Sequence, residues 1–176
     1  MIVLGPDRAT VEVLVFREGL LSAVGHDLVL RVTAFELAID PAAPSVVARL
    51  DPASLRVASA VRDGRPLPGA LRPRDVAEIE DAIASAVLRV RRFPELRFES
   101  TAVAPREGGW DVRGALALAG VTRPLMVPVR RAGERVLAAA RLHQPDFGIA
   151  PYRAMLGALR VKPDVEVRLS APAEGL

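Results

Sequence analysis

Hydrophobic and polar residues alternate along most of this chain with a period of two residues. In the N-terminal half the alternation covers residues 10–16, 27–40, 45–51 and 54–58. In the C-terminal half it covers residues 96–103, 110–119, 121–130, 135–143 and 165–171. Because successive side chains of a strand point to opposite faces of a sheet, each segment predicts a strand with one apolar face. The segments follow one another at hairpin-like spacing without βαβ alternation, so we expect an antiparallel sheet.

One segment has a helical period instead. Its apolar residues are three and four positions apart: Val76, Ile79, Ile83, Val87 and Val90. Acidic residues fill its first turns and arginines its end, as the helix dipole favours, and Pro94 is expected to end it. The pattern predicts an amphipathic helix over about residues 74–91 that packs as a lid on the end of a barrel or along its side. The stretch before it, 62–75, is rich in Gly, Pro and Arg and predicts a long loop.

The strand expected over residues 27–40 changes phase part of the way along. Its apolar residues fall on one parity and then on the other: first Leu28, Leu30 and Val32, then Phe35, Leu37 and Ile39. A slip of this kind predicts a bulge or a sharp bend near Ala34, which is how sheets curl into barrels. A second irregularity is expected in segment 121–130, because Pro124 and Pro128 cannot both take part in full strand pairing.

This set of strands fits a closed barrel or a sandwich, and the phase slip favours the barrel. We therefore expect a mainly β fold, an antiparallel closed barrel of about eight strands with one inserted helix. A barrel of that size has an interior just able to hold one small or slender ligand. Small residues on the predicted strands are expected to leave room inside: Gly114, Ala115, Ala117, Ala138 and Ala140.

Composition limits the classes of protein to which the chain can belong. Its 176 residues contain no linker-like stretch, so we expect one domain over residues 1–176. The sequence pI is about 10.4, yet the net charge at pH 7 is only +3. Nearly all basic residues are arginines, which do not titrate in proteins, so the pI overstates the basicity at neutral pH. Acidic residues are interspersed and aromatic residues are few, which argues against nucleic-acid binding.

Two absences in the sequence bear on location and chemistry. There is no cysteine, which excludes disulfides, thiolate nucleophiles and Cys-ligated metals. No apolar run approaches the ~20 residues that span a bilayer, and the N-terminus lacks the pattern of a signal peptide. We therefore expect a cytoplasmic protein without a transmembrane segment.

His26 and Asp27 are the only adjacent imidazole and carboxylate in the chain, and they raise the question of catalysis. Neighbouring residues on a strand point to opposite faces, so Asp27 is not expected to orient the His26 ring as a triad requires. None of the candidate nucleophiles lies in a nucleophile-elbow motif such as Gly-x-Ser-x-Gly; the candidates are Ser22, Ser59, Ser100 and Thr122. We expect His26 to be a structural residue or to lie at the mouth of a pocket.

Metal and cofactor sites are also weakly indicated. A metal site needs three or four converging ligands, and the chain has two histidines, His26 and His143, with Asp27 and Asp146 as plausible carboxylates. None has the spacing of a known metal motif, so we expect no metal and no cofactor. The tripeptide Asp146-Phe147-Gly148 spells the magnesium motif of kinases, but the other kinase motifs are missing. We expect Phe147 to fill the barrel interior instead.

Four motifs in order resemble a known family. They are GHDLVLRV (25–32), RFPELRFESTAV (92–103), WDVRGALALAGVTRPLMVPV (110–129) and PDFGI (145–149). Together they resemble the YceI-like family, the lipocalin-like polyisoprenoid-binding proteins. The resemblance implies a lipocalin-like extended barrel, partly covered by its helix, that encloses a long apolar tunnel. It also implies that an amphiphile with an isoprenoid tail is bound there without being chemically changed.

From the parity of the strands and this resemblance we assign residues to a binding site. The lining of the barrel is expected to comprise Leu28, Leu30, Val32, Phe98, Val112, Leu116, Leu118, Val127 and Phe147. The mouth of the pocket is assigned to His26, Arg72 and Arg92, because guanidinium groups match the oxyanions of a head group. The same apolar residues would also suit a dry core, which the periodicity does not distinguish from a tunnel.

The function expected from the sequence is non-catalytic binding, sequestration or transport of an amphiphilic, isoprenoid-type lipid. One alternative is an enzyme for a hydrophobic substrate with His26 as general base. Another is an interaction module with a filled barrel, and a homodimer is one assembly that the sequence allows.

Overall fold

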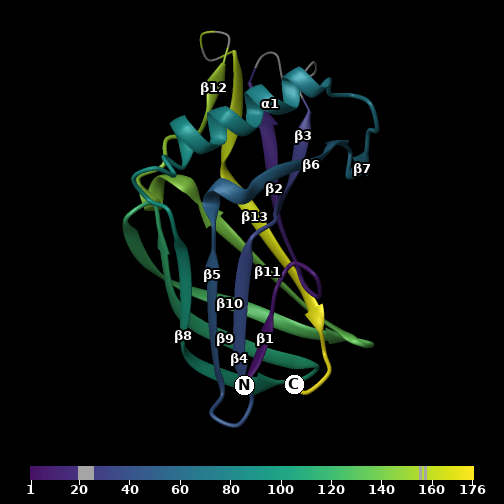
Figure 1. Cartoon of the computed structure of the whole chain (residues 1–176), viewed down its shortest axis with the longest axis vertical. Helices are drawn as coiled ribbons and strands as arrows, with labels where there is room; N and C mark the ends of the chain where they lie inside the picture. The colour runs from purple at the N-terminus through teal and green to yellow at the C-terminus, as the bar shows by residue number, and fades with distance from the viewer. Residues whose placement is uncertain (20–25, 155, 157) are drawn as a thin grey trace.

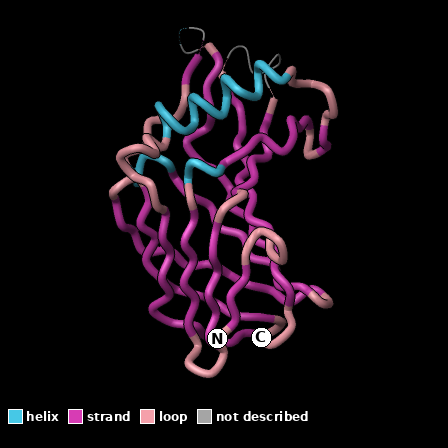
Figure 2. The backbone as a smooth tube through the Cα atoms, in the orientation of Figure 1, coloured by secondary structure: helices cyan, strands magenta, loops and turns pink. Residues whose placement is uncertain are grey.

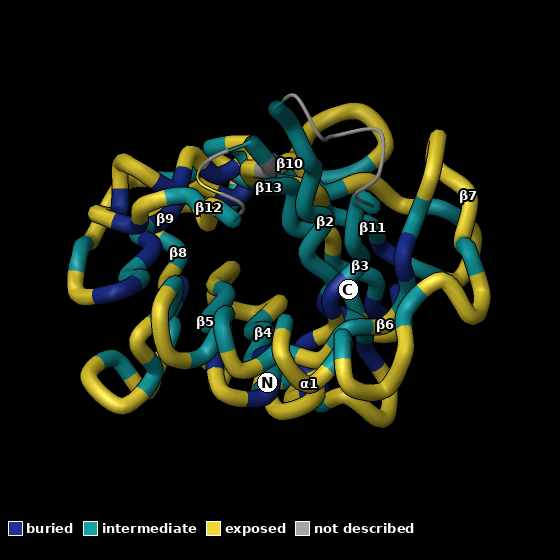
Figure 3. Tube along the Cα trace, turned by 90° about the horizontal axis from the view of Figure 1, so that it is seen from above, coloured by how far each residue is buried: buried dark blue, intermediate teal, exposed yellow. Residues whose placement is uncertain are grey.

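Thirteen antiparallel strands form one sheet in the residues that the computed structural model describes, which are 1–19, 26–154, 156 and 158–176 (Figure 1). The strands are β1 (Ile2–Leu4), β2 (Thr10–Glu18), β3 (Asp27–Val32), β4 (Phe35–Asp40), β5 (Ser45–Leu50), β6 (Leu55–Arg62), β7 (Arg65–Pro66), β8 (Leu96–Arg106), β9 (Gly109–Leu118), β10 (Val121–Ala132), β11 (Arg135–His143), β12 (Arg153–Ala154) and β13 (Leu159–Pro172). Their hydrogen-bonded order is β1-β4-β5-β8-β9-β10-β11-β13-β2-β3-β6-β7, and β12 pairs with β13. The sheet is strongly curled, so its two faces are an inner and an outer one (Figure 3).

Every segment with a period of two forms a strand, which confirms the mainly β, antiparallel fold. The strands β1, β7 and β12 were not expected. They have only three, two and two residues, which is too short for an alternation to be visible. The strand count therefore exceeds the expected eight, and the hydrogen-bonded order runs as an open path from β1 to β7.

The predicted bend near Ala34 divides segment 27–40 into two strands. β3 pairs with β2 and β6, whereas β4 pairs with β1 and β5, so the two halves lie near opposite ends of the strand order. Thr33 and Ala34 form the break between them. Because the break shifts the phase by one residue, the apolar residues of both halves face the inside of the curled sheet.

Ser54 holds this bend together. It ends a short 3-10 helix, η1 (Pro52–Ser54), that lies opposite the break, and it is only 6% exposed. Its hydroxyl donates to the Asp51 carbonyl at 2.7 Å and accepts the Ala34 N–H at 2.9 Å. Its carbonyl accepts the Thr33 hydroxyl at 2.9 Å. One buried residue thus satisfies backbone groups that the interrupted strands leave unpaired.

The predicted helix is present but ends earlier than expected. α1 (Pro73–Ala82) begins with Pro73, and the Arg72 N–H donates to the Asp75 carboxylate at 2.9 Å. A π-helical turn, η2 (Ile83–Val87), continues it. The helix stops there because Arg89 adopts a left-handed conformation with φ of 51°, well before Pro94. Residues 88–91, which were assigned to the helix, belong instead to the connection to β8.

The helix crosses the upper part of the molecule and is attached to β6 (Figures 1 and 2). β6 carries a bulge opposite Val29 and Leu30, and beside it the Val57 N–H donates to the Glu80 carboxylate at 2.9 Å. Arg56 lies 3.9 Å from the same carboxylate. Glu80 therefore fastens the helix to the strand at a backbone donor.

Strand β10 is only partly paired on one side. It pairs with β9 from Val121 to Arg130 but with β11 only from Val129 to Ala132. The stretch without a β11 partner contains Pro124 and Pro128, as the sequence predicts. The short 3-10 helix η3 (Gln144–Phe147) contacts β10 there, and the Arg123 guanidinium donates to the Asp146 carbonyl at 3.1 Å.

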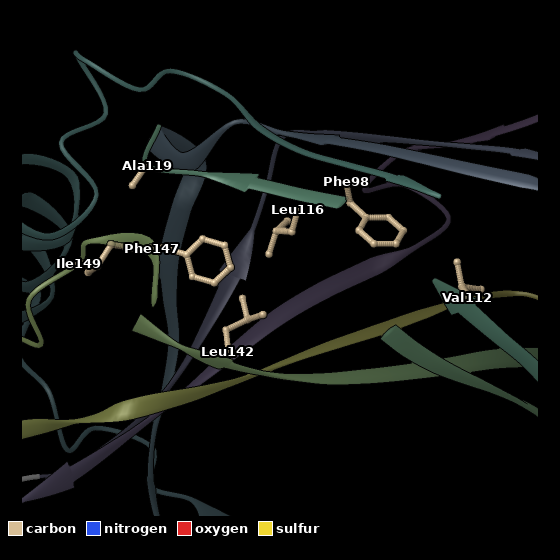
Figure 4. Packing of buried hydrophobic residues seen from close by; sticks show 7 residues of the cluster. All are labelled: Phe98, Val112, Leu116, Ala119, Leu142, Phe147 and Ile149. Carbon is tan, nitrogen blue, oxygen red and sulfur yellow. The ribbon is translucent and has the colours of Figure 1, made fainter. Parts of the chain in front are cut away.

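Buried apolar side chains form two clusters. The larger surrounds Phe98 and Phe147 (Figure 4) and comprises Phe98, Val112, Leu116, Ala119, Leu142, Phe147 and Ile149. The smaller lies near the chain termini and comprises Leu4, Ala9, Leu37, Val136, Ala171 and Ala173. Among the described residues, no large side chain is less than 2% exposed. The inner face of the sheet is therefore not packed solid.

Replacing Ser54 by Ala tests the bend. The change leaves the Ala34 N–H without its partner near a buried site, so the free energy of unfolding is expected to fall by ~1–3 kcal/mol in urea denaturation. Ser85→Ala is the matched control, because the Ser85 hydroxyl is exposed and bonds only to the Asp81 carbonyl one helical turn earlier. The control is expected to change stability by less than about 0.5 kcal/mol. Equal effects of the two substitutions would contradict the role given to Ser54.

Candidate binding cavity

A cavity of about 780 Å³ occupies the inside of the curled sheet. Its walls are the inward rows of alternating side chains, for example Val11, Val13 and Val15 of β2 and Phe35, Leu37 and Ile39 of β4. Strands β3, β5, β8, β9, β10, β11 and β13 add similar apolar rows, and α1 closes part of one side. Its volume lies within the range of about 300–1,000 Å³ that is typical of ligand pockets.

All nine residues assigned to the lining lie on the wall of this cavity. Six of them are buried: Leu30, Val32, Phe98, Val112, Leu116 and Phe147. Leu28, Leu118 and Val127 are only partly buried although they point inward, because the cavity leaves their surfaces uncovered. Figure 4 shows Phe98, Leu116 and Phe147 directed toward a common interior space from three different elements.

Gly114 does not leave room in the cavity as expected. A Cβ at Gly114 would lie 2.4 Å from the Glu99 carbonyl oxygen and 2.6 Å from the Phe98 ring. The ring of Phe98 therefore fills the space that the missing side chain leaves. Ala138 and Ala140 do line the cavity, whereas Ala115 and Ala117 do not.

The polar lining residues at the upper end come from strands that the sequence keeps far apart. Arg17 ends the inward row of β2, and His26 precedes that of β3. Tyr152 directly precedes β12, and Arg160 lies near the start of β13. Strand register brings them close, because Val161 pairs with Arg17 and Arg160 pairs with Glu18. Arg17, Tyr152 and Arg160 were not assigned to the site. The parity of Val11, Val13 and Val15 extends to Arg17 and could have indicated it.

The charges at this end are largely matched within the protein. The Arg17 guanidinium lies 3.2 Å from the Asp27 carboxylate, which also accepts the Arg17 N–H at 2.9 Å. Arg160 lies 3.8 Å from Glu18. On the helix face toward the cavity, Glu78 is paired with Arg74 at 2.9 Å. The upper end of the cavity is therefore polar without a large excess of either charge.

Among the described contacts, His26 and Asp27 do not form the hydrogen-bonded pair that a triad requires. Asp27 turns to Arg17, and among the described residues the His26 ring has no hydrogen bond or ion pair. Of the proposed nucleophiles, Ser59, Ser100 and Thr122 are not on the cavity wall, and Ser22 lies outside the described residues. His26 itself lines the cavity next to the inward row of β3.

Arg72 and Arg92, which were assigned to the pocket mouth, do not line the cavity. Both are exposed. Arg72 precedes the first turn of α1, and the Arg92 guanidinium lies 5.3 Å from the centre of the Phe93 ring, where it makes a cation–π contact. Their places at the cavity are taken by Arg17 and Arg160.

The opposite end of the cavity lies at the connection between β4 and β5. Asp40, Pro41, Pro44 and Ser45 line it there. The N–H groups of Ala43 and Ala42 donate to the Asp40 carboxylate and lower its pKa below the usual value of 3.8. The Asp40 carboxylate thus stabilises the β4–β5 turn, and two backbone N–H groups partner its charge.

The residues considered as metal ligands do not converge. The His143 Nδ1 lies 2.6 Å from the Asp164 carboxylate on the outer face, and Arg141 lies 2.7 Å from the same carboxylate. Asp146 lies in η3. In the part of the chain that the structure describes, no group of three or more His, Cys, Asp or Glu side chains is placed to hold a metal ion.

A curled antiparallel sheet around an apolar cavity, with one helix across its upper part, defines the lipocalin-like class of folds. Within that class, the chain belongs to the family described by the YceI-like domain model, which matches residues 16–173. The resemblance stated from the sequence motifs is thereby confirmed. No curated protein matches the sequence.

Solved structures share the fold at low sequence identity. Burkholderia cenocepacia BcnA is 18% identical with a TM-score of 0.60, and the match covers 94% of this chain and 96% of that one. A polyisoprenoid binding domain from Saccharophagus degradans, implicated in plant cell wall breakdown, is 11% identical with a TM-score of 0.61, covering 96% and 94%. The Campylobacter jejuni YCEI protein is 11% identical with a TM-score of 0.56, covering 82% of both chains.

Among the described residues, no helix has the length and apolar character needed to cross a membrane.

The pair His143 and Asp164 gives a testable pH dependence. The hydrogen bond from His143 is the main cause that holds the pKa of Asp164 below its usual value of 3.8. A carboxylate with a lowered pKa in the folded state stabilises the protein above the unfolded pKa, and that stability is lost as the pH falls through the folded value. His143→Ala should therefore raise the Asp164 pKa in a carboxyl NMR titration. It should reduce stability near neutral pH, with the difference shrinking below about pH 4. An unchanged Asp164 titration would contradict the assignment.

Proposed function

We propose that this protein binds an amphiphilic lipid with an isoprenoid tail inside the cavity and carries it without chemical change. The observation that supports the proposal is the cavity of about 780 Å³ with apolar walls from nearly every long strand and polar groups at its ends. Such a site suits a ligand with a long apolar tail and a polar head. The Saccharophagus degradans domain of the same fold is described as polyisoprenoid binding, which agrees with this choice of tail.

In this proposal the sheet acts as a closed, lipocalin-like barrel. The strand order is an open path, but the chain itself joins its two ends, because β3 and β4 are halves of one bent segment and β5 and β6 are halves of the next. Counting each bent segment as one strand gives a circuit of eight long strands from β2 round to β13. In the segment formed by β5 and β6, β5 pairs with β8 but β6 does not. Helix α1 contacts β6 and would cover the gap between β6 and β8.

The tail would lie along the nine assigned wall residues from Leu28 to Phe147, and the head group near His26, Arg17 and Arg160. Each buried methylene contributes ~0.8 kcal/mol, so a tail of about fifteen carbons gives ample affinity from burial alone. The matched charges at the upper end favour a head group that carries little net charge over one that needs several free cations.

The proposal treats the protein as non-catalytic. His26 has the position of a general base at the cavity but lacks a hydrogen-bonded carboxylate among the described residues, because Asp27 is engaged by Arg17. An interaction module with a filled barrel is disfavoured for a different reason, since the inward side chains leave a cavity of about 780 Å³.

Native mass spectrometry and organic extraction of freshly purified protein test the binding. We expect a non-covalent adduct that is released by solvent and has the mass of an isoprenoid lipid. Purified protein that is consistently free of lipid, and that also takes up no prenyl alcohol added from solution, would overturn the proposed function.

A substitution that fills the cavity is the second test. Ala138→Leu adds apolar volume to a wall residue, so it is expected to weaken prenyl-alcohol binding about tenfold or more while leaving stability unchanged or raised. Ala102→Leu is the matched control, because Ala102 is an exposed strand residue outside the cavity wall. Binding is measured by fluorescence competition and stability by urea denaturation. Equal binding by the two variants would show that the ligand does not occupy the cavity.

A further inference from the structure

Leu156 is the most exposed large apolar residue of the described chain. It lies in the connection between β12 and β13 and is 110% exposed, more than an extended reference chain would show. Tyr152, at the start of the same hairpin, is 44% exposed. The hairpin stands at the upper end of the molecule, beside α1 (Figure 1). Because neither side chain is buried within the protein, the hairpin presents apolar surface to the solvent.

The charged residues of this hairpin are all cations. From Ala150 to Pro163 the sequence contains Arg153, Arg160 and Lys162 and no acidic residue, and all three side chains are exposed. Arg153 and Arg160 are directly paired across the two strands. Like charges at opposite positions of a strand pair are destabilising, so this arrangement is relieved by an external anion. Glu18, at 3.8 Å from Arg160, matches only one of the three charges.

The hairpin is also continuous with the cavity. Tyr152 and Arg160 belong both to the hairpin region and to the cavity wall, and the Val161 N–H donates to the Tyr152 carbonyl at 2.9 Å. A ligand that leaves or enters at the upper end would pass beside these residues. The hairpin therefore lies on the side of the protein at which a lipid would enter the polar end of the cavity.

We propose that the β12–β13 hairpin docks this end of the protein on the surface of an anionic lipid bilayer. Leu156 enters the boundary between head groups and acyl chains, and Arg153, Arg160 and Lys162 contact lipid phosphates. An exposed apolar residue with basic residues on the flanking strands is the pattern that binds such interfaces. The proposal rests on the proposed function, because a lipid ligand is what makes a bilayer the natural partner. Docking then places the cavity where its ligand is dissolved.

Vesicle co-sedimentation of the full chain tests the docking. Vesicles of phosphatidylcholine with phosphatidylglycerol are expected to bind the protein, and vesicles of phosphatidylcholine alone to bind it much less. Added salt should weaken binding, because it screens the charges at the surface. Equal binding to both vesicles, or none to either, would overturn the proposal.

Two variants separate the apolar and the charged contributions. Leu156→Asp is expected to weaken binding to the anionic vesicles about tenfold or more, since a fully exposed leucine loses its place in the interface. Met126→Asp is the matched control, because Met126 is 51% exposed but lies on β10, away from the hairpin. Arg153→Glu should weaken binding by roughly fivefold for each unit of charge lost. If both aspartate variants bind equally, Leu156 does not dock.

An acidic protein partner is the competing explanation. Soluble polyglutamate that displaces the protein from vesicles, together with no effect of Leu156→Asp, would assign the hairpin to an acidic protein surface and overturn the proposal.

The lipid content of each variant distinguishes docking from ligand binding. Leu156→Asp should still bind prenyl alcohol from solution, because Leu156 is not on the cavity wall. A wild-type protein that binds prenyl alcohol but no vesicle would refute docking and leave the proposed function standing. One that binds vesicles but no lipid ligand would refute the proposed function, although the hairpin would still dock on the bilayer.

Discussion

The hydrogen-bonded bend at Thr33 and Ala34, held by Ser54, is the constraint on which the rest of this structure depends. It shifts the strand phase by one residue, so that the apolar residues of β3 and of β4 both face inward. Without the shift, one of the two rows would face solvent and the sheet could not enclose a continuous apolar space. The bend also sends β3 and β4 to opposite ends of the strand order, which makes the sheet curl back on itself.

The hollow interior follows from how the inward rows meet. Much of the wall is Val, Leu and Ala, and large aromatic side chains are few, so the opposite walls do not reach each other. Where an aromatic ring does enter, as Phe98 does, a glycine on the neighbouring strand gives it room close to the wall. Inward residues such as Leu28 and Leu118 are therefore only partly buried, although they belong to the same rows as buried ones. An interior of this kind gains stability when an apolar ligand covers those surfaces.

Polar groups line both ends of the cavity, and at the upper end most of the charged ones are engaged in pairs. Asp27 with Arg17 and Glu18 with Arg160 fix the ends of β2, β3 and β13 in register. The same arrangement explains why the adjacent His26 and Asp27 do not act together: strand geometry separates their side chains, and Asp27 meets an arginine from another strand. Arg153 and Lys162 of the β12–β13 hairpin are exposed, have no acidic partner among the described residues and do not line the cavity.

The sequence by itself determined the antiparallel sheet, the position of the bend and the nine apolar wall residues, because alternation and its phase slip are local properties of the chain. It also indicated the start of α1, because acidic residues in the first turns of a helix are a local signal. The tertiary structure decided three further features. They are the helix end at Arg89, the strands of two or three residues, and the presence of Arg17 and Arg160 at the cavity in place of Arg72 and Arg92. These features depend on contacts between segments far apart in the sequence, such as Val161 with Arg17 and Glu80 with Val57, and no periodicity within one segment encodes such contacts.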